Sequence, residues 1–380
     1  MAVEYTGGGR VSGGVGDDHE RDMNAVESTR RFDRWLAQRL QLVSRDLRLK
    51  HRRMAEDAFF FMRASFYRWA QVWPEECAAL RSAPRVLGIG DLHVENFGTW
   101  RDCEGRLIWG VNDFDEATVL PYTNDLVRLS TSALIAIEES RLATPVRRAC
   151  EAVLEGYTAA MREGGMPVVL AEHHRWLRDL AVGRLKEQRA YWDHLLALPP
   201  VSTRVPALVR KLLQAALPEK GLPYRIVHRR AGLGSLGRQR FTALAHWRGG
   251  TIAREVKPLT TSAWLWTREG DVALRYSDII QRAVRVADPF LSVNQGWVAR
   301  RLAPDCSRVE LARIASVRDE CKLLWMMGWE TGNVHLGTTR QRKSILKDLK
   351  TRRADWLTRA ARAMRDATLK DWRDWRGRGR

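Results

Sequence analysis

The sequence predicts an α+β fold with a mostly helical large lobe and a small antiparallel β-sheet lobe. Apolar residues recur at helical spacing over most of the first 200 residues and again from about residue 309. Between these regions, residues 225–257 have the pattern of three short strands separated by glycine turns. A chain of 380 residues is long enough for two lobes, because domains typically contain about 100–200 residues.

The expected elements follow in chain order. Helices are predicted over residues 26–73, with Pro74 as a stop, and a buried strand over 85–90. Residues 97–100 and 106–111 flank a turn and predict a hairpin. Thr123-Asn124-Asp125 is expected to cap a helix, after which helical pattern continues to about residue 198. We expect four segments: a disordered leader (1–24), a helical lobe with the hairpin (25–220), a β lobe (221–300) and a C-terminal helical region with a basic tail (301–380).

The formal net charge is +19, and about half of it lies after Thr339. Such a tail attracts polyanions, including nucleic acid, acidic lipid or a phosphorylated ligand. No segment is apolar enough to span a bilayer, and the first residues lack the apolar core of a signal peptide. The five cysteines are scattered and form no C-x-x-C pair, so we expect reduced thiols and a cytoplasmic protein.

Polar side chains cluster where the predicted strands end. Asp91, His93 and Asn96 follow the first strand, and Asp113 and Asp115 follow the hairpin. Phosphoryl transfer needs a carboxylate that orients or deprotonates the acceptor, and oxygen ligands for Mg²⁺. We expect Asp91 to act as the base and Asn96 and Asp113 to bind the metal. Asp115 is expected to be a second ligand or a neighbour that tunes the site. His93 is expected either to face a phosphate or to bind a backbone carbonyl.

A glycine-rich loop forms the second group of candidate residues. Gly232, Gly234, Ser235 and Gly237 lie between predicted strands rather than before a long helix, which favours a loop folded over phosphates. Lys257, about twenty residues further on, is expected to neutralise the phosphates. The alternative is an ordinary hairpin turn with a lysine on the following strand. Glu255 is a candidate acidic partner of Lys257, because residues two apart lie on one face of a strand.

These motifs resemble those of aminoglycoside phosphotransferases and related small-molecule kinases. From about Arg53 onward the chain resembles more closely a bacterial family, the domain of unknown function 2252, which is placed among kinase-like proteins. The resemblance is carried by Arg53-Met54, Phe61-Met62-Arg63, the segment Gly90-Asp91-Leu92-His93-Val94-Glu95-Asn96-Phe97-Gly98, Asn112-Asp113-Phe114-Asp115-Glu116-Ala117, Gly232-Leu233-Gly234-Ser235-Leu236-Gly237, Val256-Lys257 and Ala287-Asp288-Pro289-Phe290.

The resemblance implies a protein-kinase-like fold with ATP and Mg²⁺ as cofactors, acting on an unknown acceptor. In ordinary kinases the glycine loop and lysine precede the catalytic loop, so we expect the two lobes in permuted order. Ile89 stands where kinases usually have histidine, and the spacing from Asn96 to Asp113 is a few residues long. The resemblance also implies that Asp125 anchors a helix.

Two other functions remain open from the sequence. The chain could be a catalytically inactive kinase-like protein that binds nucleic acid through its basic surface. Asp91-x-His93 and the later acidic cluster also fit a metal-dependent phosphohydrolase, although the further histidine motifs of a two-metal site are missing.

Overall fold

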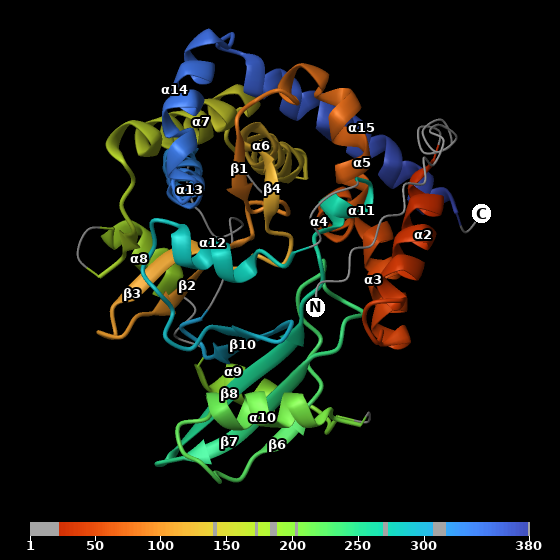
Figure 1. Ribbon diagram of the computed structural model, residues 1–380, viewed down its shortest axis with the longest axis vertical. Coiled ribbons are helices and arrows are strands. Elements are labelled where there is room, and N and C mark those ends of the chain that lie inside the picture. The colour runs from red at the N-terminus through yellow and green to blue at the C-terminus, as the bar shows by residue number, and fades with distance from the viewer. Residues whose placement is uncertain are drawn as a thin grey trace, which may run out of the picture.

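The computed structural model describes residues 23–139, 143–171, 174–182, 188–201, 204–268, 273–306 and 317–378. Within these residues the fold is α+β, as predicted, with a large helical part and small antiparallel sheets (Figure 1). The leader expected at residues 1–24 lies almost entirely outside the described residues. No helix in the described segments is long and apolar enough to cross a membrane.

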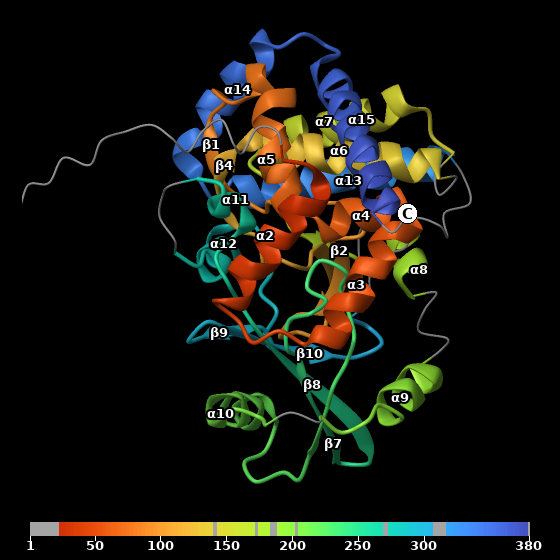
Figure 2. The ribbon, with the colours of Figure 1, turned by 90° about the vertical axis from the view of Figure 1, so that its right-hand side faces the viewer.

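The N-terminal helices form one side of the helical part and pack on the C-terminal helix (Figure 2). Asn24 caps the first of them by accepting the N–H groups of Val26 and Glu27. The expected stop at Pro74 is wrong, because the last of these helices continues through it. The helices are α2 (Ala25–Ala37), α3 (Ser44–Glu56), α4 (Ala58–Ala64), α5 (Phe66–Glu76) and the 3₁₀ turn η1 (Ala78–Leu80).

Long helices make up the rest of the core. The closest pair, α7 (Val146–Glu163) and α13 (Val317–His335), cross where Gly156 and Gly328 let the two backbones meet. α6 (Tyr122–Glu138) is buried over nearly its whole length and packs against α7 and α15. The other elements are α8 (Arg175–Val182), α11 (Ala263–Trp266), α12 (Tyr276–Arg282), η4 (Thr339–Gln341), α14 (Arg342–Thr351) and α15 (Trp356–Gly377).

Two small sheets lie beneath these helices. β1 (Arg85–Gly88) pairs with β4 (Thr118–Pro121), and Gly88 lies opposite Thr118. The predicted hairpin is present as β2 (Phe97–Arg101) and β3 (Leu107–Val111), and β5 (Val168–Val169) adds a short third strand. All five β3 residues are buried. The ends of β1 and β3 therefore deliver the polar segments 89–96 and 112–117 to the same region.

The third sheet forms the lower part of the molecule, with the strand order β6-β7-β8-β10-β9 (Figure 1). The predicted turn at residues 248–250 is present, with Arg248 and Gly249 at positive φ. The last two strands were not predicted. The sheet consists of β6 (Arg225–Val227), β7 (Phe241–Trp247), β8 (Gly250–Pro258), β9 (Ser292–Asn294) and β10 (Trp297–Leu302).

The small sheet packs on a helix with one face and carries charged side chains on part of the other. Phe241, Ala243, Val256 and Ala299 pack with Val209 and Leu213 of α10 (Ala207–Ala216). Because successive strand residues alternate between faces, Glu255, Lys257 and Arg300 project from the other face, toward the helical part. α9 (Gln188–Leu196) and α10 thus accompany the small sheet, although the sequence placed their residues in the helical lobe.

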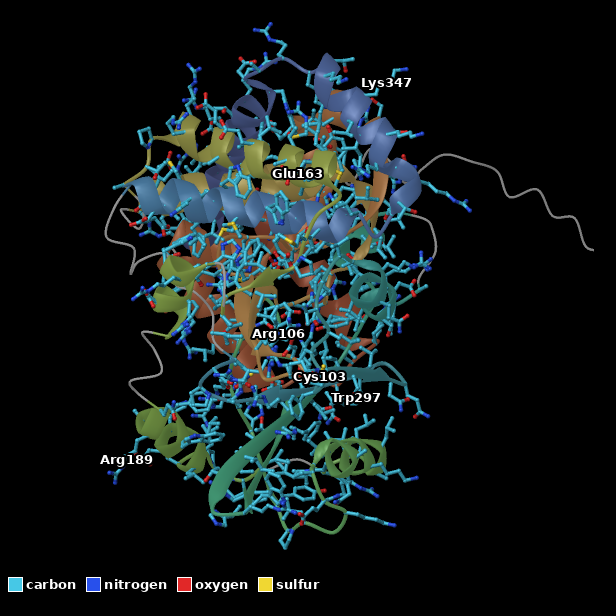
Figure 3. All side chains as sticks on the ribbon, turned by 90° about the vertical axis from the view of Figure 1, so that its left-hand side faces the viewer. Cys103, Arg106, Glu163, Arg189, Trp297 and Lys347 are labelled. Carbon is cyan, nitrogen blue, oxygen red and sulfur yellow. The ribbon has the colours of Figure 1, made fainter. Side chains whose placement is uncertain are left out.

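The hairpin and the small sheet meet directly. Arg101 of β2 forms an ion pair with Asp305, just after β10, at 2.6 Å, and the Thr99 hydroxyl donates to the Asp305 carbonyl at 2.7 Å. Figure 3 shows side chains throughout this junction, with Cys103 and Arg106 labelled at the hairpin turn and Trp297 on β10. The charged face of the sheet therefore faces the polar loops of the helical part across a cleft.

Candidate functional site

A buried carboxylate fixes the loop that follows β1. Both Asp125 oxygens accept backbone protons, from Ile89 at 2.7 Å and from Gly90 at 2.9 Å. Asp125 also binds His335 Nε2 at 2.9 Å, and none of its surface is exposed. It does not cap α6, because it lies within the first turn and no side chain caps that helix. Asp125 therefore anchors the loop after β1, and the helix-anchoring role that the family resemblance implied stays a prediction.

Asn96 joins the two polar segments to each other. Its amide nitrogen donates to the carbonyl oxygens of Asp91 at 3.2 Å and Asp113 at 3.0 Å. Its side-chain oxygen accepts the Asp113 N–H at 3.0 Å. These three bonds fix the orientation of the amide, since donors and acceptors would conflict if it were flipped. Asn96 therefore holds Asp91 and Asp113 at a fixed separation. Its expected role as a metal ligand stays a prediction, because its side-chain oxygen already accepts the Asp113 N–H.

The Asp91 carboxylate is oriented by an arginine that lies entirely in the core. Arg128 Nε donates to Asp91 Oδ1 at 3.0 Å, and Arg128 Nη2 bonds both this oxygen and the Met62 carbonyl. The Arg128 guanidinium also lies 4.9 Å from the ring centroids of Phe66 and Trp69. This arrangement leaves Asp91 Oδ2 facing the cleft.

Lys257 of β8 reaches across the cleft to the carboxylates of the hairpin. Its Nζ lies 3.2 Å from both oxygens of Asp113 and 2.7 Å from Asp115 Oδ2. Burial opposes ionisation of Asp113, but the charges of Lys257 and the nearby Arg300 prevail and hold its pKa well below the usual range. Burial and the Asp113 charge raise the pKa of Asp115. Burial lowers the pKa of Lys257.

The glycine-rich loop is held down by α3. The Val43 N–H donates to the Gly237 carbonyl at 2.7 Å, and Asp46 forms an ion pair with Arg230 at 2.8 Å. Lys50 Nζ donates to the Gly234 carbonyl at 3.3 Å. Lys50 is 3% exposed, and burial lowers the pKa of its ammonium group. The loop is therefore held in place through contacts along one helix.

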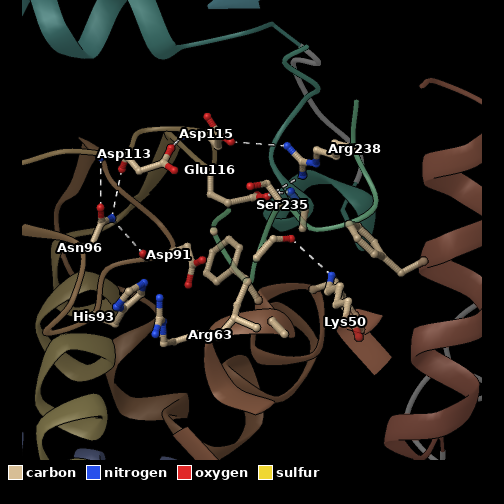
Figure 4. A pocket seen from close by; sticks show the side chains of 18 residues that line it. Lys50, Arg63, Asp91, His93, Asn96, Asp113, Asp115, Glu116, Ser235 and Arg238 are labelled. Atoms are coloured by element: carbon tan, nitrogen blue, oxygen red, sulfur yellow. Dashed lines mark hydrogen bonds and ion pairs between the residues drawn. The ribbon is translucent and has the colours of Figure 1, made fainter. Parts of the chain in front are cut away.

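The loop closes a small cavity over the carboxylates. The cavity holds about 60 Å³ and is lined by Asp91 and Asp113 on one side and by Ser235 and Lys50 on the other (Figure 4). Gly234 lies so close that an added Cβ would be 3.4 Å from Asp91 Oδ2. A cavity of this size accommodates a single small group such as a phosphoryl group. A larger cavity of about 620 Å³ adjoins it, and Asn96, Asp113 and Gly232 line both.

The structure brings most of the predicted site residues to this place. The small cavity is lined by Asp91, His93, Asn96, Asp113, Asp115, Gly232, Gly234 and Ser235, and Lys257 contacts two of them. His93 Nδ1 accepts the Glu95 N–H at 3.2 Å rather than binding a carbonyl through this atom.

Two candidates are placed elsewhere. Gly237, at positive φ, faces Leu47 of α3 and does not line either cavity. Glu255 has Arg229, Arg240 and Arg300 as its ion-pair partners, so the partners of Lys257 are Asp113 and Asp115 instead. The structure therefore assigns Gly237 to packing and Glu255 to an arginine cluster.

The carboxylates can be compared with the needs of Mg²⁺. This ion is usually held by one or two carboxylates together with substrate phosphates and water. Asp113 and Asp115 supply two, and Asp115 Oδ1 is buried without a hydrogen-bond partner among the described residues. Within that part of the chain, no three His, Cys, Asp or Glu side chains converge in a metal-binding cluster. The two aspartates therefore fit an ion shared with a ligand.

Three contributors to the site were missed at the sequence level. Arg128 and Lys50 lie on helices. The spacing of polar and apolar residues around them does not indicate that either side chain contacts the site. Glu116 accepts the Ala263 N–H at 2.6 Å and pairs with Arg238 of the glycine loop at 3.5 Å. Burial raises the pKa of Glu116 to about 7. The one sequence signal for Glu116 is that it directly follows Asp113 and Asp115, which were themselves predicted to belong to the site.

Comparison with known proteins finds a family whose model matches the first part of this site. Residues 41–188 match the model of the family described as uncharacterized protein conserved in bacteria (DUF2252). The expected resemblance to this bacterial family is confirmed over that range, which includes α3, the hairpin and Asp125. Neither the curated proteins nor the solved structures gave a match to the chain.

Proposed function

We propose that this protein is an ATP- and Mg²⁺-dependent phosphotransferase with a protein-kinase-like site built from lobes in permuted order. The contact of Lys257 with Asp113 and Asp115 carries the proposal. It joins a lysine from the small sheet to the carboxylates of the hairpin, 142 and 144 residues apart in the chain. Protein kinases likewise use a glycine-rich loop, a lysine on the third strand and a metal-binding aspartate around the phosphates.

The order of parts within the small sheet supports the same proposal. The glycine loop connects β6 to β7, and Lys257 lies on β8, the next strand of the sheet. The loop and the lysine therefore have the relative places that phosphate binding in a kinase-like lobe requires. The glycines of this loop let the backbone approach phosphate oxygens closely. Gly232 has a positive φ, a conformation that costs free energy for residues with a side chain.

Each residue then has a defined part in the reaction. Asp91 Oδ2 accepts the proton of an acceptor hydroxyl while that oxygen bonds to the terminal phosphorus; the bond to the bridging oxygen breaks and ADP leaves. Arg128 keeps Asp91 oriented. Asp113 and Asp115 would hold Mg²⁺, which supplies positive charge to the phosphate oxygens. Lys50, opposite Asp91, adds a cation beside the transferred group.

Calorimetry with Mg-ATP tests the proposal. We expect saturable binding that Asp113→Asn weakens by at least about tenfold, because one charge-assisted interaction with the bound ion is worth about 1.5 kcal/mol or more. Asp355→Asn is the control, since Asp355 is exposed at the start of α15. Equal affinities of the two variants would remove Asp113 from the site. Phosphate release from simple phosphoesters without ATP would favour the phosphohydrolase instead.

A further inference from the structure

The larger cavity has a charged inner wall. Arg229, Arg240 and Arg300 all bind the Glu255 carboxylate, at 2.8, 2.6 and 2.8 Å. Glu255 is completely buried behind them, whereas the three arginines line the cavity. One negative charge thus faces three positive charges, and a ligand in the cavity meets guanidinium groups rather than the carboxylate. The same arginines hold the pKa of Glu255 well below its usual range in spite of burial.

A fourth guanidinium lies in the same cavity and forms no ion pair within the described residues, although the buried Glu330 acts on its charge at longer range. Arg285 donates to the Val111 carbonyl at 3.2 Å, and its guanidinium lies 4.5 Å from the Trp100 ring and 5.0 Å from the Phe114 ring. Aromatic faces hold a cation without neutralising it. The acidic side chains on the cavity wall are Asp113, which Lys257 already binds, and Asp288. The wall therefore carries an excess of positive charge.

The position of the cluster relative to Lys257 defines the ligand. Glu255 and Lys257 are two residues apart on β8, so their side chains leave the same face about 7 Å apart. Arg300 lies directly opposite Glu255 on β10. Positive groups therefore continue along the strand from Lys257 to the arginines. A lone phosphate cannot contact both ends, whereas a chain of two or three phosphoryl groups can.

We infer that the larger cavity binds a polyphosphate chain lengthwise along β8, with one end at Asp113, which Lys257 binds, and the other at Arg229 and Arg300. Arg285 lies on the hairpin side of this chain, beside Val111 and Phe114. This inference rests on the proposed function in identifying Lys257 as a phosphate ligand. The inference goes beyond the proposed function because it places phosphate charge, rather than an uncharged base, on the wall formed by the arginine cluster. Cavities of about 300–1,000 Å³ hold ligands of nucleotide size, so the chain can be free or part of a nucleoside polyphosphate.

Calorimetry of the full chain with inorganic tripolyphosphate tests the inference, since this probe has no base or sugar. We expect saturable binding, weakened by about tenfold or more in Arg300→Gln and in Arg285→Gln. Arg285 takes part in no ion pair among the described residues, so its variant leaves the Glu255 cluster intact. Arg248→Gln is the control, because it makes the same charge change at an exposed turn of the same sheet. Thermal unfolding of each variant verifies the fold.

The outcomes separate this inference from the proposed function. Tripolyphosphate binding that depends on Arg300 and Arg285 supports the inference even if Mg-ATP binding proves independent of Asp113. Equal tripolyphosphate affinities for the wild type, both cavity variants and the control would overturn it, as would an absence of binding. If neither arginine variant weakens tripolyphosphate binding while Mg-ATP binding still needs Asp113, the inference is overturned and the proposed function stays in place.

Discussion

Buried charge is the property that the individual residues of the cleft share. Lys50, Arg128, Lys257 and Glu255 are each at most 3% exposed. An ionised side chain in the interior is costly unless partners compensate it. Glu255 and Lys257 have such partners in opposite charges, and Arg128 has Asp91. For Lys50 the only hydrogen-bond acceptor within the described residues is the Gly234 carbonyl, which is consistent with a cation reserved for a ligand.

Glu116 makes this cost measurable through pH. Burial raises its pKa to about 7, from an ordinary value of 4.5. The folded protein therefore keeps a proton that the unfolded chain releases, so this carboxyl lowers stability as pH rises from about 4.5 to 7. The difference corresponds to about 3 kcal/mol at most. Glu330, whose pKa is also raised to about 7 by burial, acts in the same direction.

We expect Glu116→Gln to remove this pH-dependent loss. Urea unfolding of the variant and the wild type at pH 5 and pH 8 gives the free energy of unfolding of each. The variant should gain stability relative to the wild type by about 1–3 kcal/mol between the two pH values. Glu163→Gln, near the end of α7, is the control for a change of charge alone. A constant difference at both pH values would show that Glu116 is already ionised at pH 5.

At the scale of elements, the helical part depends on one close crossing. A Cβ added at Gly156 of α7 would lie 1.9 Å from the Trp325 carbonyl oxygen, and one at Gly328 of α13 would lie 2.0 Å from the Val153 carbonyl oxygen. Both obstacles are backbone atoms, which cannot turn aside as a side chain can. The two helices can approach this closely only because each presents a glycine to the other.

Gly156→Ala should therefore destabilise the protein even though alanine favours helix by about 1 kcal/mol. Overpacking typically costs 1–3 kcal/mol, and here the rigid backbone contact places the expected loss near the upper end, at about 3 kcal/mol. Gly377→Ala, at the end of α15, is the control, since nothing lies within 4 Å of its added Cβ. Chemical denaturation measures the free energy of unfolding of both variants. If Gly156→Ala were as stable as the wild type or more stable, the close crossing would be disproved.

The local sequence pattern predicted individual elements and motifs better than it predicted how these elements pack together. The hairpin and the glycine turn at residues 248–250 have short-range signals, and the structure contains both. β9 and β10 escaped prediction, because each is short and lies among polar residues whose pairing depends on β8. Asp91, Asn96 and Asp113 stood out through order and spacing. Arg128 and Lys50 did not, because their contacts join helices that are distant along the chain.

At the scale of the whole molecule, the basic C-terminal segment is part of the core. α15 packs against helices from α2 to α7 and buries Leu357, Ala361, Met364 and Trp375. Its Asp371 also forms an ion pair with Arg68 of α5 at 2.9 Å. Part of the excess of positive charge after Thr339 therefore sits on a helix whose apolar side the rest of the protein needs. Deletion of residues 340–380 would expose that surface together with its partners.

A nucleic-acid role for this helix is best tested by neutralising only its exposed face. Arg362, Lys370 and Arg373 are exposed, so changing all three to glutamine should leave the melting temperature within a few degrees of the wild type, whereas deletion of 340–380 should abolish cooperative unfolding. We also expect Mg-ATP binding to be unchanged in the triple variant, since these residues line neither cavity.

Filter binding of duplex DNA at several salt concentrations completes the test. If the helix held phosphates through these three side chains, the slope of log affinity against log salt would become shallower by about 2.7. An unchanged slope would leave the charge of α15 without a part in nucleic-acid binding, and a melting temperature unaffected by the deletion would contradict its place in the core.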